Sequence, residues 1–275
     1  MNKFDSLSSA TKLTIGLVLC LFAGSGALGS DQVKPARAGL NQTEAGPVQA
    51  QILYKEAQKL IQTKNYPQAL SKLEEAARLG NLDAMRETGI FLEDGTAGNE
   101  DLKQAEYWFR KAVASNDPES MYRLAGIVGI RNNTETKEVM DLVKRAADLG
   151  HRDAQRKISI AYYSGKGVPR DLQKAFKYRC MAAAQGEPKS AYKAGIQLMA
   201  GEGIKRDYGE AARLFKISAK HKPEAANKLA EIYSSGGPGL KADPVQAAYY
   251  RKLFREMTRS SNEDTKGLIQ SLDRD

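Results

Sequence analysis

DAQRKISIAYYSGKGVPRDLQKAFKYRCMAAAQG, residues 153–186, is the stretch that decides the fold of this chain. Its first part places small and apolar residues at helical spacing, from Ala154 to Tyr162. The glycines and the proline of SGKGVPRD interrupt that periodicity. A second helix is expected between Asp171, a residue type that caps helix starts, and Gly186, which suits a left-handed helix end. Two helices of this length cannot enclose a core alone, so the stretch predicts a helix pair that needs neighbours.

The same pattern recurs along the chain at a nearly constant interval. The equivalents of Ala154 are spaced 36, 34, 36 and 35 residues apart, and they are Ala84, Ser120, Ser190 and Ala225. The expected second helices each place a large apolar residue about one turn after a small one. These large residues are predicted to be core, and they are Trp108, Tyr178, Leu214 and Tyr250. A fixed period of this length indicates a solenoid, in which each helix pair buries its apolar face against its neighbours.

These residues resemble the Sel1-like repeat, a relative of the tetratricopeptide repeat. The match is fullest at 154–186, where Gly165-Lys-Gly167-Val168, Asp171, Lys174-Ala175 and Gly186 are all in register. It is nearly as full at 190–222, is partial at 84–116, and shifts toward a tetratricopeptide unit at 52–80. The resemblance implies an all-α, right-handed α-solenoid of about six helix-turn-helix repeats over residues 47–258.

Two repeats depart from the pattern. In the repeat at 120–150, the loop GIRNNTETKE (129–138) has no G-x-G, and the second helix is expected to start about two residues early. The loop SSGGPGLKADP of the last repeat carries one extra residue. Each loop is either a functional insertion or simple drift of the repeat, and drift is the favoured interpretation.

The N-terminal residues 1–29 have the pattern of an export signal. A basic start precedes the short apolar run Leu13–Phe22, and small residues suit cleavage before Ser30. An uncleaved N-terminal anchor is the alternative, whereas Leu19 is too bulky for a lipoprotein signal at Cys20. A flexible leader is expected at 30–46, and a C-terminal cap or tail at 259–275. The signal predicts a periplasmic location, with secretion or anchoring by the uncleaved segment as alternatives.

The charge of the chain is basic but mixed. Its 42 Lys and Arg are interleaved with 33 Asp and Glu, for a net charge of +9 and a pI near 9.3. This charge permits contact with an anionic polymer or surface, yet a solvated repeat surface explains it equally. No basic helix with interleaved stacking aromatics is present, and an export signal also argues against nucleic acid as a partner.

Nothing in the sequence forms a catalytic motif. His151 and His221, the only histidines, fall near the ends of second helices, where a polar side chain has a simple electrostatic use. Cys180 stands in an alanine-rich helix and is expected to be a small buried residue. The Gly165-Lys-Gly167 loop lacks the spacing of a phosphate-binding loop and recurs as the turn between helices. We expect no enzyme activity, no cofactor and no metal site.

The surface of the predicted solenoid is the remaining candidate for a functional site. In the tetratricopeptide-like geometry that the resemblance implies, the first helix of each pair lines the concave side. Tyr and Arg, the side chains most often found as binding anchors, occur at its inward positions. The alternative is that these positions are merely exposed, or that some tyrosines pack between repeats. The predicted partner-binding residues are Arg86, Glu93, Tyr122, Arg156, Tyr163, Tyr192, Met199 and Asn227.

The resemblance implies a non-catalytic adaptor. The sequence therefore predicts a periplasmic protein–protein interaction module, a scaffold or regulator of an envelope signalling or assembly component, with a protein partner in the concave groove. A monomer without membrane insertion after signal cleavage is expected. Two alternatives stay open: a secreted virulence-type factor that engages a host protein, and an accessory protein of the cell wall or an exopolysaccharide.

Overall fold

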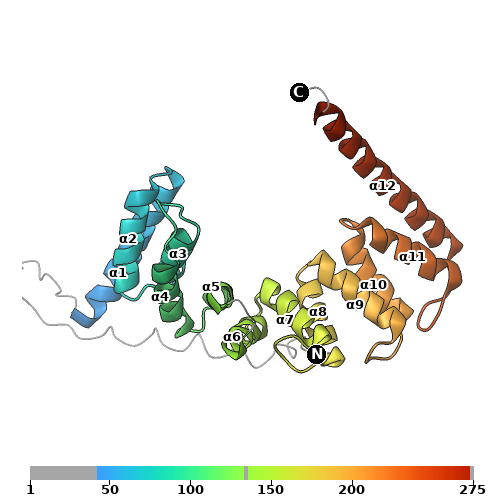
Figure 1. The fold of residues 1–275 in the computed structure, drawn as a ribbon, viewed down its shortest axis with the longest axis horizontal. Helices are drawn as coiled ribbons and strands as arrows, with labels where there is room; N and C mark the ends of the chain where they lie inside the picture. The colour runs from blue at the N-terminus through green and yellow to red at the C-terminus, as the bar shows by residue number, and fades with distance from the viewer. Residues whose placement is uncertain (1–41, 133–135, 273–275) are drawn as a thin grey trace, which may run out of the picture. The chain divides into compact units, whose positions relative to one another are not determined.

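The computed structural model describes residues 42–132 and 136–272, with side-chain surroundings between 46 and 259 (Figure 1). The predicted signal 1–29 and most of the predicted leader 30–46 lie outside this part of the chain. The described residues form twelve α-helices and one isolated bridge, between Gly237 and Leu240. The helices are α1 (Gln42–Gln62), α2 (Tyr66–Arg78), α3 (Leu82–Glu93), α4 (Leu102–Val113), α5 (Pro118–Asn132), α6 (Lys137–Asp148), α7 (Arg152–Ser164), α8 (Leu172–Ala184), α9 (Pro188–Ala200), α10 (Tyr208–Ala219), α11 (Pro223–Ser235) and α12 (Pro244–Leu272).

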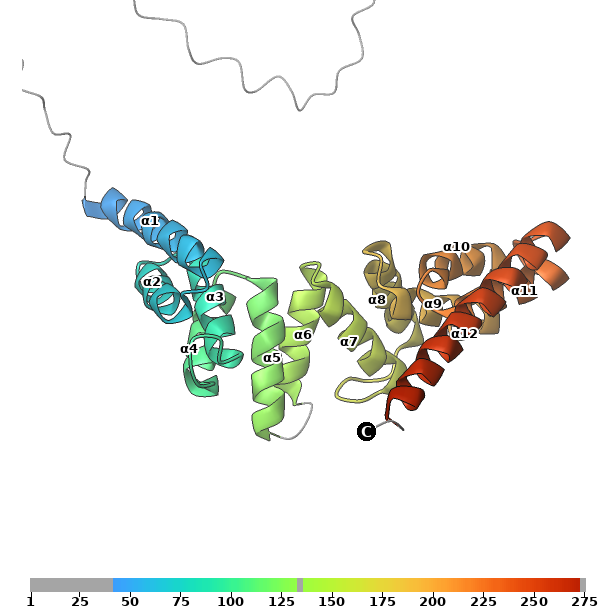
Figure 2. The same ribbon diagram turned by 90° about the horizontal axis from the view of Figure 1, so that it is seen from above.

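The helices pack in chain order, as a solenoid requires. Every helix from α1 to α12 contacts the next one along the chain, and α3 also contacts α5. Figures 1 and 2 show the successive helices side by side. Six helix pairs result, which confirms the predicted all-α repeat solenoid. Helix α1 begins within the range predicted for the leader, and α12 continues without a break past residue 258, where a separate cap or tail was expected.

The predicted helix ends are confirmed in the best-matching repeat. The Asp171 carboxylate caps α8 by accepting the Lys174 backbone N–H at 2.9 Å. Gly186 follows α8 at a φ of 80°, a conformation that glycine adopts without steric cost. In the loop between α7 and α8, Gly165 and Gly167 have φ angles of 75° and 73°. The next repeat has the same pair of left-handed glycines, so this loop is the ordinary turn between the two helices.

Close approach of the two helices in a pair depends on a glycine. An added Cβ on Gly195 in α9 would lie 2.6 Å from Cε1 of Phe215 in α10, and one on Gly89 in α3 would lie 2.5 Å from Cε1 of Phe109 in α4. Both phenylalanines are fully buried. Small residues in the first helix therefore make room for large apolar knobs from the second.

The four large apolar residues predicted for the core of the second helices are buried. Trp108 and Tyr178 are 5% and 4% exposed, and Leu214 and Tyr250 are also buried. The Tyr178 ring lies parallel to that of Tyr162 at a centroid distance of 5.9 Å. These rings hold the helices of one pair together and are not available to a ligand.

Residues of both irregular loops make hydrogen bonds to the start of a helix. Helix α6 begins at Lys137, one position earlier in its repeat than α4, α8 and α10 and not the two expected, and the Thr136 hydroxyl caps it by accepting the Val139 backbone N–H. The longer loop after α11 folds onto the start of α10, where the Tyr208 backbone N–H donates to the Pro238 carbonyl at 2.6 Å. Among the described residues, no helix is both long and apolar enough to cross a membrane.

Candidate functional site

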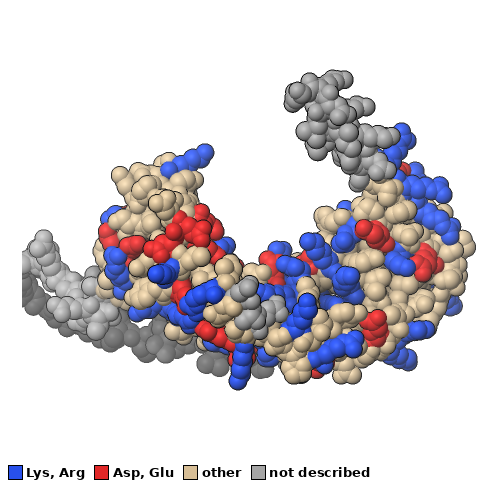
Figure 3. Space-filling view, in the orientation of Figure 1, with Lys and Arg blue, Asp and Glu red and all other residues tan. Residues whose placement is uncertain are grey.

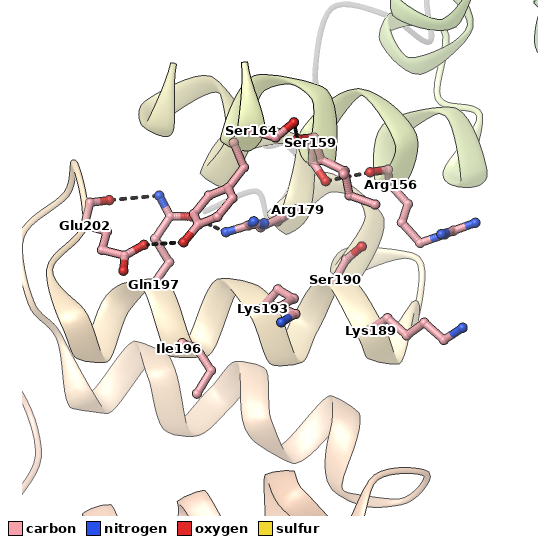
Figure 4. A pocket seen from close by; sticks show the side chains of 12 residues that line it. Arg156, Ser159, Ser164, Arg179, Lys189, Ser190, Lys193, Ile196, Gln197 and Glu202 are labelled. Carbon is pink, nitrogen blue, oxygen red and sulfur yellow. Dashed lines mark hydrogen bonds between the residues drawn. The ribbon is translucent and has the colours of Figure 1, made fainter. Parts of the chain in front are cut away.

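A cavity of about 410 Å³ opens between the first helices of two successive repeats, α7 and α9 (Figure 4). Two predicted binding residues, Arg156 and Tyr163, line it from α7. Apolar side chains of Ile160 and Ile196 line it as well, one from each helix. The pocket is therefore an open, largely apolar recess on the side of the solenoid where partner binding was predicted.

A polar network forms one wall of this pocket. Arg179 of α8 is 6% exposed, and its Nη1 donates to Oε1 of Gln197 at 2.7 Å. The Gln197 amide nitrogen donates in turn to two backbone carbonyls, those of Leu172 at 2.8 Å and Glu202 at 2.9 Å. Because both ends of the Gln197 amide are bound, its orientation is determined and it holds the guanidinium in place.

Tyr163 covers the guanidinium from the other side. The guanidinium carbon of Arg179 lies 4.3 Å from the centroid of the Tyr163 ring, a cation–π geometry. The Tyr163 hydroxyl donates to Oε2 of Glu202 at 2.9 Å, and this bond raises the pKa of the tyrosine. Burial lowers the pKa of Arg179, but guanidinium remains charged at any physiological pH.

Three more cations surround the pocket: Arg156, Lys189 and Lys193. Figure 4 shows them on the side away from Glu202, the one carboxylate that lines it. The surplus of positive charge extends beyond the pocket. Residues 136–259 contain 25 Lys and Arg against 13 Asp and Glu, whereas residues 46–132 contain 11 against 12. On the face in Figure 3, acidic side chains gather over α3 and basic ones prevail at right.

Two of the other predicted residues, Arg86 and Glu93, form ion pairs between repeats. Nη1 of Arg86 lies 2.8 Å from Oδ1 of Asp117, the buried acid that caps α5 through the Ser120 backbone N–H. Glu93 accepts from Arg123 of the next repeat at 2.7 Å. Their charges are therefore already balanced within the solenoid.

Two predicted tyrosines contact the residue at the N-cap position of the next helix pair. Tyr122 stacks on His151 at a centroid distance of 4.7 Å, and Nζ of Lys222 lies 5.6 Å from the Tyr192 ring. These contacts correspond to the alternative in which tyrosines pack between repeats. Met199 is half-buried against the core, and Asn227 is exposed on α11. The structure thus brings only Arg156 and Tyr163 together in one pocket.

The histidine prediction needs a correction at His151. This residue begins α7 rather than ending α6, because its Nδ1 accepts the Ala154 backbone N–H at 3.1 Å. The ring proton is therefore on Nε2, which donates to Glu119 at 2.8 Å. That bond, aided by Arg123, lowers the pKa of Glu119 to about 2. His221 lies two residues after the last residue of α10, near the end of a second helix as expected.

Cys180 packs among apolar side chains as the sequence predicts, although it is not fully buried. It is half-buried against apolar side chains, and burial raises the pKa of its thiol to about 11. A thiol with this pKa is protonated at neutral pH and reacts slowly. Among the residues between 46 and 259 that the structure describes, no three His, Cys, Asp or Glu side chains are grouped to hold a metal ion.

Sequence reasoning missed the centre of the pocket, Arg179 and Gln197. A signal for both was present in the repeats themselves. Arg179 occupies the position of Phe109 and Phe215, four residues after the small residue of the second helix. The last repeat also has an arginine at this position, Arg251, but that side chain is exposed, whereas Arg179 is buried where two siblings have a buried phenylalanine.

Comparison with known proteins agrees with this architecture. The Sel1 repeat family model matches residues 82–117, 152–187, 188–222 and 223–251. The chain is a Sel1-like repeat protein. Comparison with curated protein sequences gave no significant match. Sel1-like repeats generally mediate protein–protein interaction and are typically non-catalytic.

Solved structures resemble this Sel1-like protein over most of its length. A Sel1 repeat protein from Oxalobacter formigenes is 25% identical, with a TM-score of 0.60, over 79% of this chain and 91% of that one. The protective antigen c5321 of uropathogenic Escherichia coli is 24% identical, with a TM-score of 0.67, over 78% of this chain. Only 47% of c5321 is covered, so this chain spans about half its length. PilF of Pseudomonas aeruginosa is 15% identical, with a TM-score of 0.51, over 82% of this chain and 99% of that one.

Proposed function

We propose that this Sel1-like repeat protein is a non-catalytic periplasmic interaction module that binds a segment of a partner protein across α7 and α9. It would act there as a scaffold or regulator of an envelope component. The observation that carries the proposal is the pocket between these helices, where Arg156 and Tyr163 lie beside exposed apolar surface. Arginine, tyrosine and a recess that excludes water are the features of strong contact sites in protein interfaces.

The other predicted residues support the choice of this pocket over the rest of the groove. Arg86, Glu93, Tyr122 and Tyr192 already have partners in the neighbouring repeat. A second protein would have to break those contacts before it could bind them. At the α7–α9 pocket, Tyr163 also has a partner in the next repeat, Glu202, but Ile160 beside it is 53% exposed and free to bury its surface on binding.

The proposed location rests on the signal-like pattern of residues 1–29. Fractionation of the native organism, followed by N-terminal sequencing, tests it. The proposal expects the mature chain in the periplasmic extract with Ser30 as its first residue. Recovery of the mature form from the culture medium would contradict the periplasmic part and favour the secreted alternative.

Partner binding can be tested with a matched pair of substitutions. Ile160→Asp places a charge at the pocket, while Ile130→Asp makes the same change at a 74% exposed position of α5, outside the pocket. Both variants should fold as the wild type does, since both side chains face solvent. Quantitative co-purification from periplasmic extract should lose the partner with Ile160→Asp and retain it with Ile130→Asp. Equal recovery with both variants would rule out the α7–α9 pocket as the binding site.

A further inference from the structure

Three core positions at the pocket differ from their equivalents in two sibling repeats. Two sibling repeats combine a glycine in the first helix with a phenylalanine in the second, as Gly89 with Phe109 and Gly195 with Phe215. In the repeat of α7 and α8, the same two positions hold Ser159 and Arg179.

The third position lies in the next repeat along the chain. The residue of α9 that binds the Arg179 guanidinium is Gln197, which is 1% exposed. The corresponding residues of α5 and α11 are Ile127 and Ile232, and both are buried. An apolar Phe–Ile combination has therefore become a polar Arg–Gln pair at this one place.

The Arg179 guanidinium lacks an ionic partner within the described part of the chain. No carboxylate there lies within 4.0 Å of it, and Nη1 to Gln197 is the only hydrogen bond that it makes. A guanidinium has five N–H donors, so several of them remain for another acceptor. The charge of Glu202 acts on this cation only from beyond that distance. Because burying a cation without a carboxylate in direct contact is costly, a bound anion would reduce that cost.

The fixed orientation of the Arg179 guanidinium favours a carboxylate as its ligand. Gln197 holds one edge of Arg179 and Tyr163 stacks on its face, so the fork is already oriented before a ligand arrives. The planar fork matches two carboxylate oxygens. Glu202 does not fill this role, because it accepts from the Tyr163 hydroxyl at 2.9 Å.

The walls of the pocket add a second requirement. Ile160 and Ile196 offer apolar surface beside the guanidinium, and Lys189 and Lys193 add positive charge. A ligand that satisfies all of these groups has a carboxylate next to an apolar side chain.

We propose that the α7–α9 pocket binds a carboxylate flanked by an apolar side chain, presented by an extended peptide segment of the partner, with Arg179 as its receptor. This inference rests on the proposed function and names the chemistry of the bound segment. The carboxylate comes from a C-terminus or from an Asp or Glu side chain, and the two sources are separable by experiment.

Four peptides test the carboxylate and its source. All are acetylated hexapeptides that end in Leu-Glu-Leu or Leu-Gln-Leu, each prepared with a free or an amidated C-terminus. Binding is measured by calorimetry and by the shift of the Arg179 side-chain Nε–H signal in NMR, which is assigned by its loss in Arg179→Met. The peptide with neither carboxylate should bind at least 10-fold more weakly than one that has the correct carboxylate. If the Gln peptide with a free C-terminus retains binding, the C-terminus is the source of the carboxylate. If the amidated Glu peptide retains binding, the side chain is the source.

A variant that restores the sibling core tests the role of Arg179 without disturbing the fold. Ser159→Gly, Arg179→Phe and Gln197→Ile together recreate the glycine, phenylalanine and isoleucine found across α3–α5 and across α9–α11. Replacing a buried charged group with well-packed apolar residues is often neutral or stabilising, so this triple variant should unfold no earlier than the wild type. Its affinity for the carboxylate peptide should fall at least 10-fold, as should that of Arg179→Met. Arg213→Met, at an exposed arginine of α10, serves as the control and should change affinity less than 2-fold.

The inference is overturned if the uncharged peptide binds as tightly as the others, or if the triple variant binds like the wild type. Polygalacturonate serves as an acidic polysaccharide for comparison. If it shifts the Arg179 NMR signal and none of the peptides does, the inference is also overturned, because the ligand would then be a polysaccharide. If the pocket shows no preference for peptides with a carboxylate, but Ile160→Asp still loses the partner protein in co-purification, the inference fails and the proposed function stands. Equal partner recovery with Ile160→Asp and Ile130→Asp refutes the proposed function itself.

Discussion

The packing of α9 against α10 predicts opposite outcomes for the same substitution at two helical glycines. A Cβ on Gly195 would lie 2.6, 2.9 and 2.9 Å from three carbons of the Phe215 ring. The ring is fully buried and cannot move aside without disturbing its neighbours. Gly126 in α5 is the matched control, because an added Cβ there meets nothing within 4 Å.

The magnitudes follow from two effects that act on both sites. Replacing glycine with alanine inside a helix stabilises the folded state by about 1 kcal/mol. Overpacking a tight core costs about 1–3 kcal/mol. Gly126→Ala has only the first effect and should raise the free energy of unfolding by about 0.5–1 kcal/mol. Gly195→Ala has both effects and should lower it by as much as about 2 kcal/mol.

Urea unfolding followed by circular dichroism measures the difference. A further variant, Gly195→Ala with Phe215→Leu, removes the ring that the added methyl group would overlap. It should recover part of the lost free energy of unfolding. If Gly195→Ala is as stable as Gly126→Ala, the helices do not approach through this glycine and the packing described here is wrong.

Three other predictions concern single side chains. Because Glu119 has its pKa lowered to about 2, it stabilises the fold above about pH 4.5 and loses that effect as the pH falls toward 2. Glu119→Gln should cost about 1 kcal/mol at pH 7, allowing for solvent screening of a side chain that is 36% exposed, and almost nothing in urea unfolding at pH 2. Arg86→Met leaves Asp117 buried without its cation, so urea unfolding should show a loss of about 2 kcal/mol with partner binding unchanged. Since burial raises the pKa of Cys180 to about 11, a thiol reagent at pH 7.5 should label it much more slowly in the native than in the unfolded protein; equal rates would contradict this.

Much of the fold can be predicted from the sequence because it depends on local and periodic signals. The cap at Asp171 and the left-handed Gly186 are local features, and both are confirmed. The aromatic cores of the second helices follow from the repeat period, since a position that recurs in every unit meets the same neighbours. The start of α7 at His151 was misassigned because a histidine at a helix junction can serve either helix.

The candidate site was less accessible from sequence for a physical reason. Inward-facing positions can be inferred from the period, but whether a side chain there is free depends on the cap residue of the next repeat. Arg86 finds an acid there and Tyr192 finds a lysine, so both are occupied by contacts between repeats. Arg179 was overlooked because the sequence template followed small and apolar positions, and a charged residue in the core falls outside such a template.

A photo-crosslinking amino acid at position 160, compared with one at position 130, tests the central claim most directly. The experiment uses the full-length protein in its native organism, and mass spectrometry maps the crosslinked peptide. The account predicts that position 160 crosslinks to one partner protein, within a segment that carries a carboxylate beside an apolar residue, and that position 130 does not. Crosslinks of equal yield and identity from both positions would contradict the account, because the α7–α9 pocket would then have no special part in binding.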